Sequence, residues 1–168
     1  RLHRLHVWFD PWLDPQGKGY QMVQSLLAIG SGGLTGTNWG HGAAKFAYLP
    51  EVHTDFAFAV FCQENGFFGA LILLLVFCLL GVAFYKITIS TREQKGFLLA
   101  AGVTFLIIGQ AFANMAMVCG IFPVIGVPLI FISYGGSSMI ISMAAIGLLL
   151  SVYDEEEKQQ LLDAEPPE

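Results

Sequence analysis

Three ionisable residues, Glu51, His53 and Asp55, alternate in the stretch YLPEVHTDFAF, which leads into a long apolar run. A carboxylate close to low-dielectric surroundings suits the role of a general base, so Asp55 is the first catalytic candidate. The competing interpretation is structural, because Asp at the start of a helix commonly acts as its N-cap. Glu51 and His53 are candidates to assist Asp55 or to bind substrate, provided that the stretch is extended. Otherwise they are solvated loop residues.

Glu64 is a second unusual carboxylate, because it lies inside the apolar run that follows Asp55. If that run is one continuous helix, Glu64 lies about 13 Å along it. A carboxylate at such a depth is costly and indicates a functional residue, here a candidate for substrate binding. The alternative is a structural ion pair or hydrogen bond to another helix.

A glycine-rich loop, SGGLTGTNWGHG, begins with Ser31, Gly32 and Gly33. Backbone N–H groups of such a loop could cradle a phosphate, although a flexible turn is the simpler interpretation. The loop lacks the G-x-x-x-x-G-K-[ST] pattern, so an ATP site is not supported. Lys45 could contact a diphosphate as a point charge. The four histidines show no metal-ligand spacing, and we assign no metal ligand.

These residues must be positioned by membrane-spanning helices. Of the 168 residues, 55% are hydrophobic and 12% are charged, and no charged residue occurs from position 96 to 153. A bilayer core requires roughly 20 apolar residues per helix. We therefore predict an all-α polytopic membrane protein with about three transmembrane helices, near 56–85, 96–118 and 133–152.

The remaining segments divide the chain into regions. Residues 1–55 are predicted to form a large extracellular loop with short interfacial helices, one of them over 20–30, where apolar residues follow helical spacing. Within the membrane part, 56–153, prolines and glycines break the helix at 119–133. Irregular backbone at membrane depth must be buried in protein or line a cavity. The acidic residues 154–168 are predicted to be a disordered tail.

The loop charges predict an orientation. Lys86, Arg92 and Lys95 cluster between the first two spans, and basic loops favour the cytoplasmic side. Residues 1–55 then lie outside and the tail lies in the cytoplasm.

The three cysteines show no spacing typical of a disulfide framework or a zinc site. Because the chain begins with Arg1, we also expect it to be a segment of a longer protein.

Three motifs, in order along the chain, carry a resemblance to a known family. DPWLDPQGKGYQMVQSLLAIGSGGLTG, YLPEVHTDFAFAV and NMAMVCGIFPVIGVPLIFISYGGSS resemble the SEDS family, which includes FtsW, RodA and SpoVE. The resemblance covers nearly the whole chain except the tail. It implies the C-terminal portion of such a protein, namely the fourth extracellular loop and the last three of ten helices.

The resemblance implies a peptidoglycan glycosyltransferase in the bacterial cytoplasmic membrane. Such an enzyme polymerises lipid II into glycan strands at the outer membrane face, paired with a class B penicillin-binding protein transpeptidase. The family's essential aspartate, in its HTDF motif, corresponds to Asp55 and would act as the general base of an inverting transfer. No cofactor is implied, although a divalent cation is compatible with a diphosphate substrate, and no nucleic-acid partner is expected. The segment alone is expected to be inactive, because it lacks much of the family's substrate cavity.

The sequence also departs from the family pattern. QENG replaces the usual EELG, Ile130 replaces a proline, and Ala116 replaces a glycine.

Two other functions stay open. One is a lipid II flippase or transporter, which the polar residues Gln110 and Asn114 would also suit. The other is a non-catalytic partner of a transpeptidase. The motifs do not separate division, elongation and sporulation roles.

Overall fold

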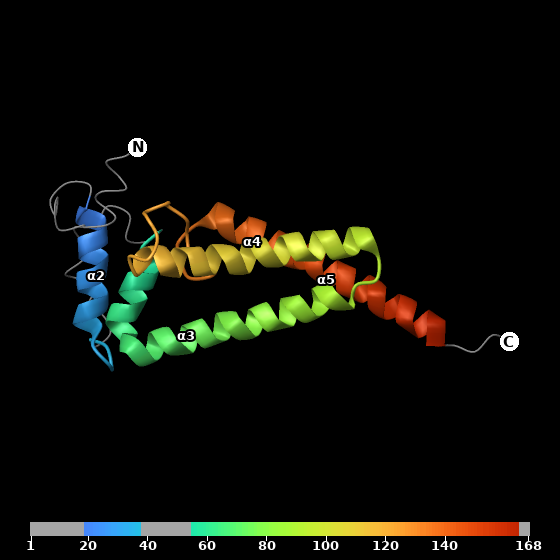
Figure 1. The fold of residues 1–168 in the computed structure, drawn as a ribbon, viewed down its shortest axis with the longest axis horizontal. Coiled ribbons are helices and arrows are strands. Elements are labelled where there is room, and N and C mark those ends of the chain that lie inside the picture. The colour runs from blue at the N-terminus through green and yellow to red at the C-terminus, as the bar shows by residue number, and fades with distance from the viewer. Residues whose placement is uncertain (1–18, 38–54, 165–168) are drawn as a thin grey trace.

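The structure, a computed structural model, describes residues 19–37 and 55–164, and the regular elements in these ranges are helices. They are α2 (Tyr20–Gly32), α3 (Ala57–Ser90), α4 (Gln94–Val118) and α5 (Gly136–Ala164), as Figure 1 shows. The all-α fold class is thereby confirmed. The helix predicted over 20–30 is α2, which runs two residues further than expected.

Three helices are long and apolar enough to cross a membrane, namely α3, α4 and residues 136–159 of α5. Many of their large apolar side chains face outward, for example Leu71 and Ile72 of α3. Helices that are apolar all round require lipid or further protein around them rather than water. The chain is therefore a membrane protein. Only Thr91–Glu93 separate α3 from α4, so the two helices run back along each other (Figure 1).

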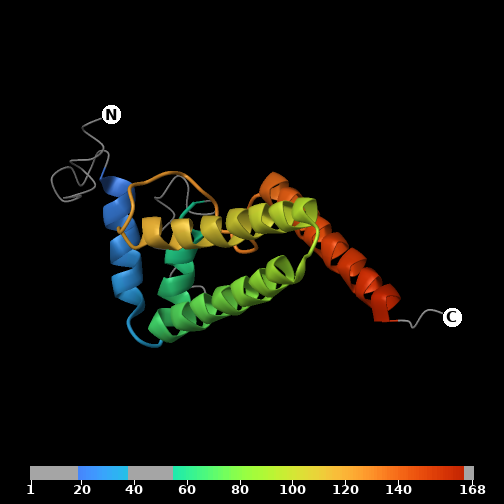
Figure 2. The ribbon, with the colours of Figure 1, turned by 45° about the vertical axis from the view of Figure 1, so that its right-hand side comes forward.

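Helix α3 bends at Gly66, where φ is 66° and ψ is −166°. This backbone conformation is essentially restricted to glycine. The bend divides α3 into a short arm, residues 57–65, and a long arm, residues 67–90. Figures 1 and 2 show the short arm beside α2, both crossing the direction of the long arm and α4. The first apolar run is thus two helical segments rather than the single continuous helix that the sequence suggested.

Residues 119–135, called here the connection, link α4 to α5 without a regular helix. Side chains of α4 supply donors to its carbonyl groups. Gln110 Nε2 donates to Pro128 O at 3.1 Å, and Asn114 Nδ2 donates to Val127 O at 2.5 Å. Because an unpaired carbonyl is costly in apolar surroundings, these bonds allow non-helical backbone to pack against the bundle.

Helix α5 continues past its apolar part to Ala164, which corrects the predicted disorder for residues 154–164. Asp154 and Lys158 form an exposed i,i+4 ion pair at 2.7 Å, and Glu156 is buried against the turn between α3 and α4. This segment is rich in Glu, Gln, Lys and Leu, which are good helix formers. Tertiary contacts and local propensity therefore extend a helix that the acidic composition alone did not indicate.

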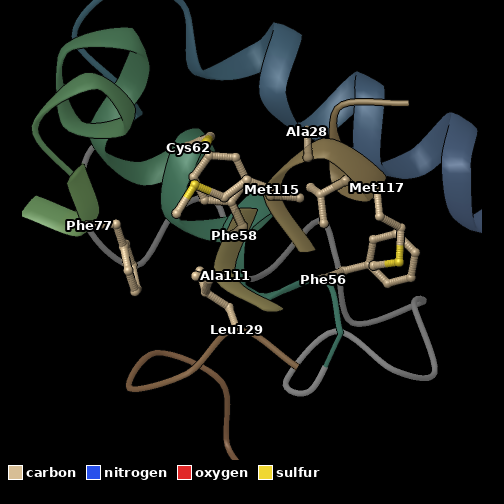
Figure 3. Close-up of a cluster of buried hydrophobic side chains, with 11 residues drawn as sticks. Ala28, Phe56, Phe58, Cys62, Phe77, Ala111, Met115, Met117 and Leu129 are labelled. Atoms are coloured by element: carbon tan, nitrogen blue, oxygen red, sulfur yellow. The ribbon is translucent and has the colours of Figure 1, made fainter. Parts of the chain in front are cut away.

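The main core lies where α2, the short arm of α3, α4 and the connection meet (Figure 3). Phe56 and Phe58 bring the start of α3 into this cluster, Met115 comes from α4, and Leu129 comes from the connection. A second cluster joins the long arm to α4 and α5 around Ile107. The main core fixes the chain at the residue that directly follows Asp55.

Candidate active site

Asp55 lies half-buried at the point where the chain enters the short arm of α3. Two contacts fix its backbone. The next residue, Phe56, is buried in the main core, and Asn114 Nδ2 of α4 donates to the backbone O of Asp55 at 2.8 Å. Neither contact uses the Asp55 carboxylate. The backbone of the catalytic candidate is therefore held from both the core and α4.

The carboxylate of Asp55 lies against the connection. A Cβ added to Gly126 would lie 3.2 Å from Asp55 Oδ2, closer than side chains normally approach. Gly126 also has a φ of 76°, which L-residues with a side chain rarely adopt. Glycine at this position therefore permits both the turn of the backbone and the close approach of the carboxylate. The connection therefore lies directly beside the Asp55 carboxylate.

The start of α3 can be compared with the alternative prediction that Asp55 is the N-cap of this helix. Phe56 occupies the N-cap position, and its apolar side chain makes no capping hydrogen bond. The first turn closes through the Phe56 carbonyl, which accepts from Ala59 N at 2.9 Å. Phe56 rather than Asp55 is thus the N-cap residue of α3, and the catalytic role of Asp55 stays a prediction.

Glu64 lies at the other end of the short arm, two residues before the bend at Gly66. Seven residues of helix, a rise of about 10 Å, separate Glu64 from Ala57, the first residue of α3. Glu64 is half-buried, and its backbone packs against the Cα of Gly36. The bend places Glu64 beside the junction of the two arms, at the other end of the short arm from Asp55, and the structure does not bring the two carboxylates together. A substrate contact by Glu64 stays a prediction.

Ser31 and Gly32, predicted as the start of the glycine-rich loop, form the end of α2 and pack with Gly33 against the bend of α3. Ser31 Oγ accepts from Gln63 Nε2 at 2.9 Å, and Gly32 is buried with its Cα against the backbone of Gln63. The carbonyl of Gly33 accepts from Phe67 N at 2.9 Å. These observed contacts are structural. Phosphate or substrate binding by Ser31, Gly32 and Gly33 stays a prediction.

Three other candidates, Lys45, Glu51 and His53, lie outside the described residues. Within 19–37 and 55–164, no group of three His, Cys, Asp or Glu side chains could hold a metal ion.

Asn114 and Gly126 belong to the surroundings of Asp55, although the sequence did not single them out as site residues. Asn114 was visible only as an amide inside an apolar span, a feature that points to function in general. Gly126 was one of several glycines in the connection. Their convergence on Asp55 depends on the fold, because 59 residues separate Asp55 from Asn114 in the chain.

The fold and the candidate site describe an all-α membrane protein in which the backbone of an aspartate is held at one end of the helix bundle. A family model described as a cell cycle protein, that of FtsW, RodA and SpoVE, matches residues 1–158. The chain belongs to the FtsW, RodA and SpoVE family, and the resemblance of its three motifs is confirmed.

Individual relatives support this assignment. The chain is 43% identical over 152 residues to the probable peptidoglycan glycosyltransferase FtsW of Geobacter sp. (strain M18), covering 90% of this chain and 41% of that protein. It is 44% identical over 151 residues to the peptidoglycan glycosyltransferase MrdB of Escherichia coli (strain K12), covering 89% and 41%. It is 41% identical over 152 residues to the stage V sporulation protein E of Bacillus subtilis (strain 168), covering 90% and 42%.

A solved structure shares the fold. It was described under the heading "Structural coordination of polymerization and crosslinking by a peptidoglycan synthase complex", and the match has a TM-score of 0.77 at 28% identity. The match covers 92% of this chain and 41% of that one. The chain thus spans about two fifths of the length of the relatives that it matches.

Proposed function

We propose that this chain supplies the general base of a peptidoglycan glycosyltransferase, and that Asp55 is that base. The observation that carries the proposal is the position of Asp55, half-buried and anchored through its backbone at one end of an apolar bundle. Two relatives that are more than 40% identical are named as peptidoglycan glycosyltransferases, which supports the same activity here. The proposed substrate is lipid II, a disaccharide on a polyprenyl diphosphate.

In the proposed reaction, the carboxylate of Asp55 takes the proton from the 4-hydroxyl of the acceptor sugar. The hydroxyl oxygen attacks the anomeric carbon of the donor sugar as the bond to the diphosphate oxygen breaks. The configuration at that carbon inverts from α to β, and polyprenyl diphosphate leaves with the negative charge. A positioned base contributes about 10²–10⁴-fold to such a rate. The remaining acceleration requires substrate positioning and positive charge on the diphosphate, for which Lys45 is our candidate.

The arrangement of charges supports an orientation for this site. Lys86, Arg92 and Lys95 are exposed around the turn between α3 and α4. That turn lies at the end of the bundle away from α2 and the short arm (Figures 1 and 2). Basic residues favour the cytoplasmic side, so Asp55 is proposed to face the outside of the cytoplasmic membrane. Sugar and diphosphate of a membrane-anchored substrate would lie at the same depth.

A transpeptidase partner is part of the proposal. The solved structure that shares this fold concerns a complex that coordinates polymerisation and crosslinking. We propose a class B penicillin-binding protein in the equivalent role, which would crosslink the glycan strand that this protein elongates.

The test uses the full-length protein with purified lipid II. Asp55→Asn keeps the size of the side chain and removes its basicity, so the polymerisation rate should fall by about 10²–10⁴-fold. Glycan length on gels and release of polyprenyl diphosphate measure this rate. Polymerisation at the wild-type rate would show that Asp55 is not the base. Transport of lipid II across vesicles without any polymer would support the transporter function instead.

A further inference from the structure

Asn114 is the most deeply buried polar side chain close to Asp55. Its exposed fraction is 0%, and it lies on α4 in contact with the main core. Burying an amide is costly unless its polar atoms are paired. The hydrogen-bond partners of Asn114 therefore indicate why an amide is buried at this position.

The Nδ2 atom of Asn114 joins two segments of the site. One hydrogen bond reaches the backbone O of Asp55 at 2.8 Å, and the other reaches Val127 O at 2.5 Å. Val127 directly follows Gly126, the residue against which the Asp55 carboxylate lies. A single amide group thus links the backbone of Asp55 to the segment that flanks its carboxylate.

The other polar atom of the same amide shows that these two hydrogen bonds determine how the amide is oriented. Asn114 Oδ1 is buried and has no hydrogen-bond partner among the residues that the structure describes. A flipped amide would place Oδ1 against two carbonyl oxygens, which only accept hydrogen bonds. The amide orientation is therefore set by Asp55 and Val127, at the expense of an unsatisfied acceptor. A buried polar group with this pattern calls for an explanation beyond packing.

We infer that Asn114 is a positioning residue for Asp55. Its amide fixes the backbone of Asp55 relative to the connection, so that the carboxylate stays where it can take the proton of the acceptor hydroxyl. This inference rests on the proposed function, in which Asp55 is the general base. In this role Asn114 acts through Asp55, since both hydrogen bonds of its Nδ2 go to backbone carbonyl groups.

Gln110 provides a matched control. It lies one helical turn before Asn114 and also donates to the connection, with Nε2 at 3.1 Å from Pro128 O, but this bond does not involve Asp55. Gln110→Ala therefore loosens the connection alone. Asn114→Ala loosens the connection and also releases the backbone of Asp55.

The experiment compares both variants in the full-length protein, with lipid II polymerisation measured across substrate concentrations. Asn114→Ala should lower kcat by about 10- to 100-fold, because small displacements of a catalytic group are costly, and KM should change little. Gln110→Ala should lower kcat by less than about threefold. Equal losses in both variants, or a wild-type kcat for Asn114→Ala, would overturn the inference. If Asn114→Ala does not accumulate in membranes, Asn114→Ser, which keeps a hydrogen-bond donor, is measured in its place.

A double variant separates positioning from a merely structural role. If Asn114 acts through Asp55, adding Asn114→Ala to Asp55→Asn should not lower the residual rate further. Multiplied losses would contradict the inference. Asp55→Asn alone tests the proposed function, since a wild-type rate in that variant rejects Asp55 as base. An inactive Asp55→Asn together with a fully active Asn114→Ala would reject only the role of Asn114.

Discussion

At the scale of single residues, the site depends on close packing around one carboxylate. Asp55 is fixed through its backbone by Asn114, and its Oδ2 lies against Gly126. A general base must be held within about half an ångström of its productive position, because misplacement reduces the rate steeply. The absence of a side chain at Gly126 is therefore as important to this arrangement as the hydrogen bond from Asn114.

Gly126→Ala should displace the carboxylate of Asp55. The new Cβ would lie 3.2 Å from Oδ2, so the carboxylate must move by a few tenths of an ångström, and polymerisation should fall on the order of tenfold. Gly120→Ala is the control, because Gly120 has a similar φ of 80° but its Cβ would meet only Met22 and Leu26, at 3.6 Å or more. Both variants should lose about 1 kcal/mol of stability from backbone strain. Equal rates in the two variants would contradict the role of Gly126.

At the scale of elements, the bend in α3 and the loop after α2 stabilise each other. The break at Gly66 interrupts the hydrogen bonds of α3, and the loop supplies replacements. The carbonyl of Gly33 accepts from Phe67 N at 2.9 Å, while Thr37 N donates to Gln63 O at 2.9 Å. The backbones approach so closely that neither Gly36 nor Gly66 has room for a Cβ. The loop therefore caps both arms of α3 at the bend.

Gly66→Ala should be strongly destabilising. Its Cβ would overlap the backbone of Leu34 and Gly36, and its φ of 66° is strained for any residue with a side chain. Strain and overpacking together should cost on the order of 3 kcal/mol or more. Thermal unfolding of the full-length protein in detergent measures this loss. Gly81→Ala on the long arm is the control, since its Cβ would make ordinary contacts with Ile108, and stability should change by less than about 1 kcal/mol. Unfolding temperatures that match for both variants would show that the bend is dispensable.

The same elements show what the sequence could predict. Uncharged apolar runs predicted the three spans, and the helical spacing of apolar residues predicted α2. The bend at Gly66 was not predicted, because QENG is compatible with a continuous helix and only contact with a loop 30 residues earlier, around Gly36, fixes the glycine conformation. Asp55 was identified from its motif. Its neighbours Asn114 and Gly126 became part of the site only through packing between distant segments.

At the scale of the whole molecule, the candidate catalytic residue Asp55 and the structural residue Glu156 lie at opposite ends of the helix bundle. Asp55 directly precedes Phe56, which packs in the main core with Ala28 of α2, whereas Glu156 lies at the turn between α3 and α4. That turn and α2 are at opposite ends of the bundle (Figure 1). Glu156 is 6% exposed, and its Oε1 accepts from Arg92 N at 2.6 Å and from Glu93 N at 3.2 Å. A carboxylate close to the start of α4 also interacts favourably with the helix dipole. Glu156 therefore ties α5 to the start of α4.

Because Glu156 and Asp55 lie at opposite ends of the bundle, substitutions of Glu156 should lower the stability of the protein without changing its polymerisation activity. Glu156→Ala leaves the N–H groups of Arg92 and Glu93 without their acceptor, which should cost about 1–3 kcal/mol. Glu156→Gln keeps one acceptor and should lose less, and Glu155→Ala, at an exposed neighbour, should change stability by less than about 0.5 kcal/mol. Because distant sites contribute additively, lipid II polymerisation per folded molecule should stay within about twofold of wild type in all three variants. A tenfold loss of kcat in Glu156→Ala without a change in unfolding temperature would instead mean that the two ends of the bundle are coupled.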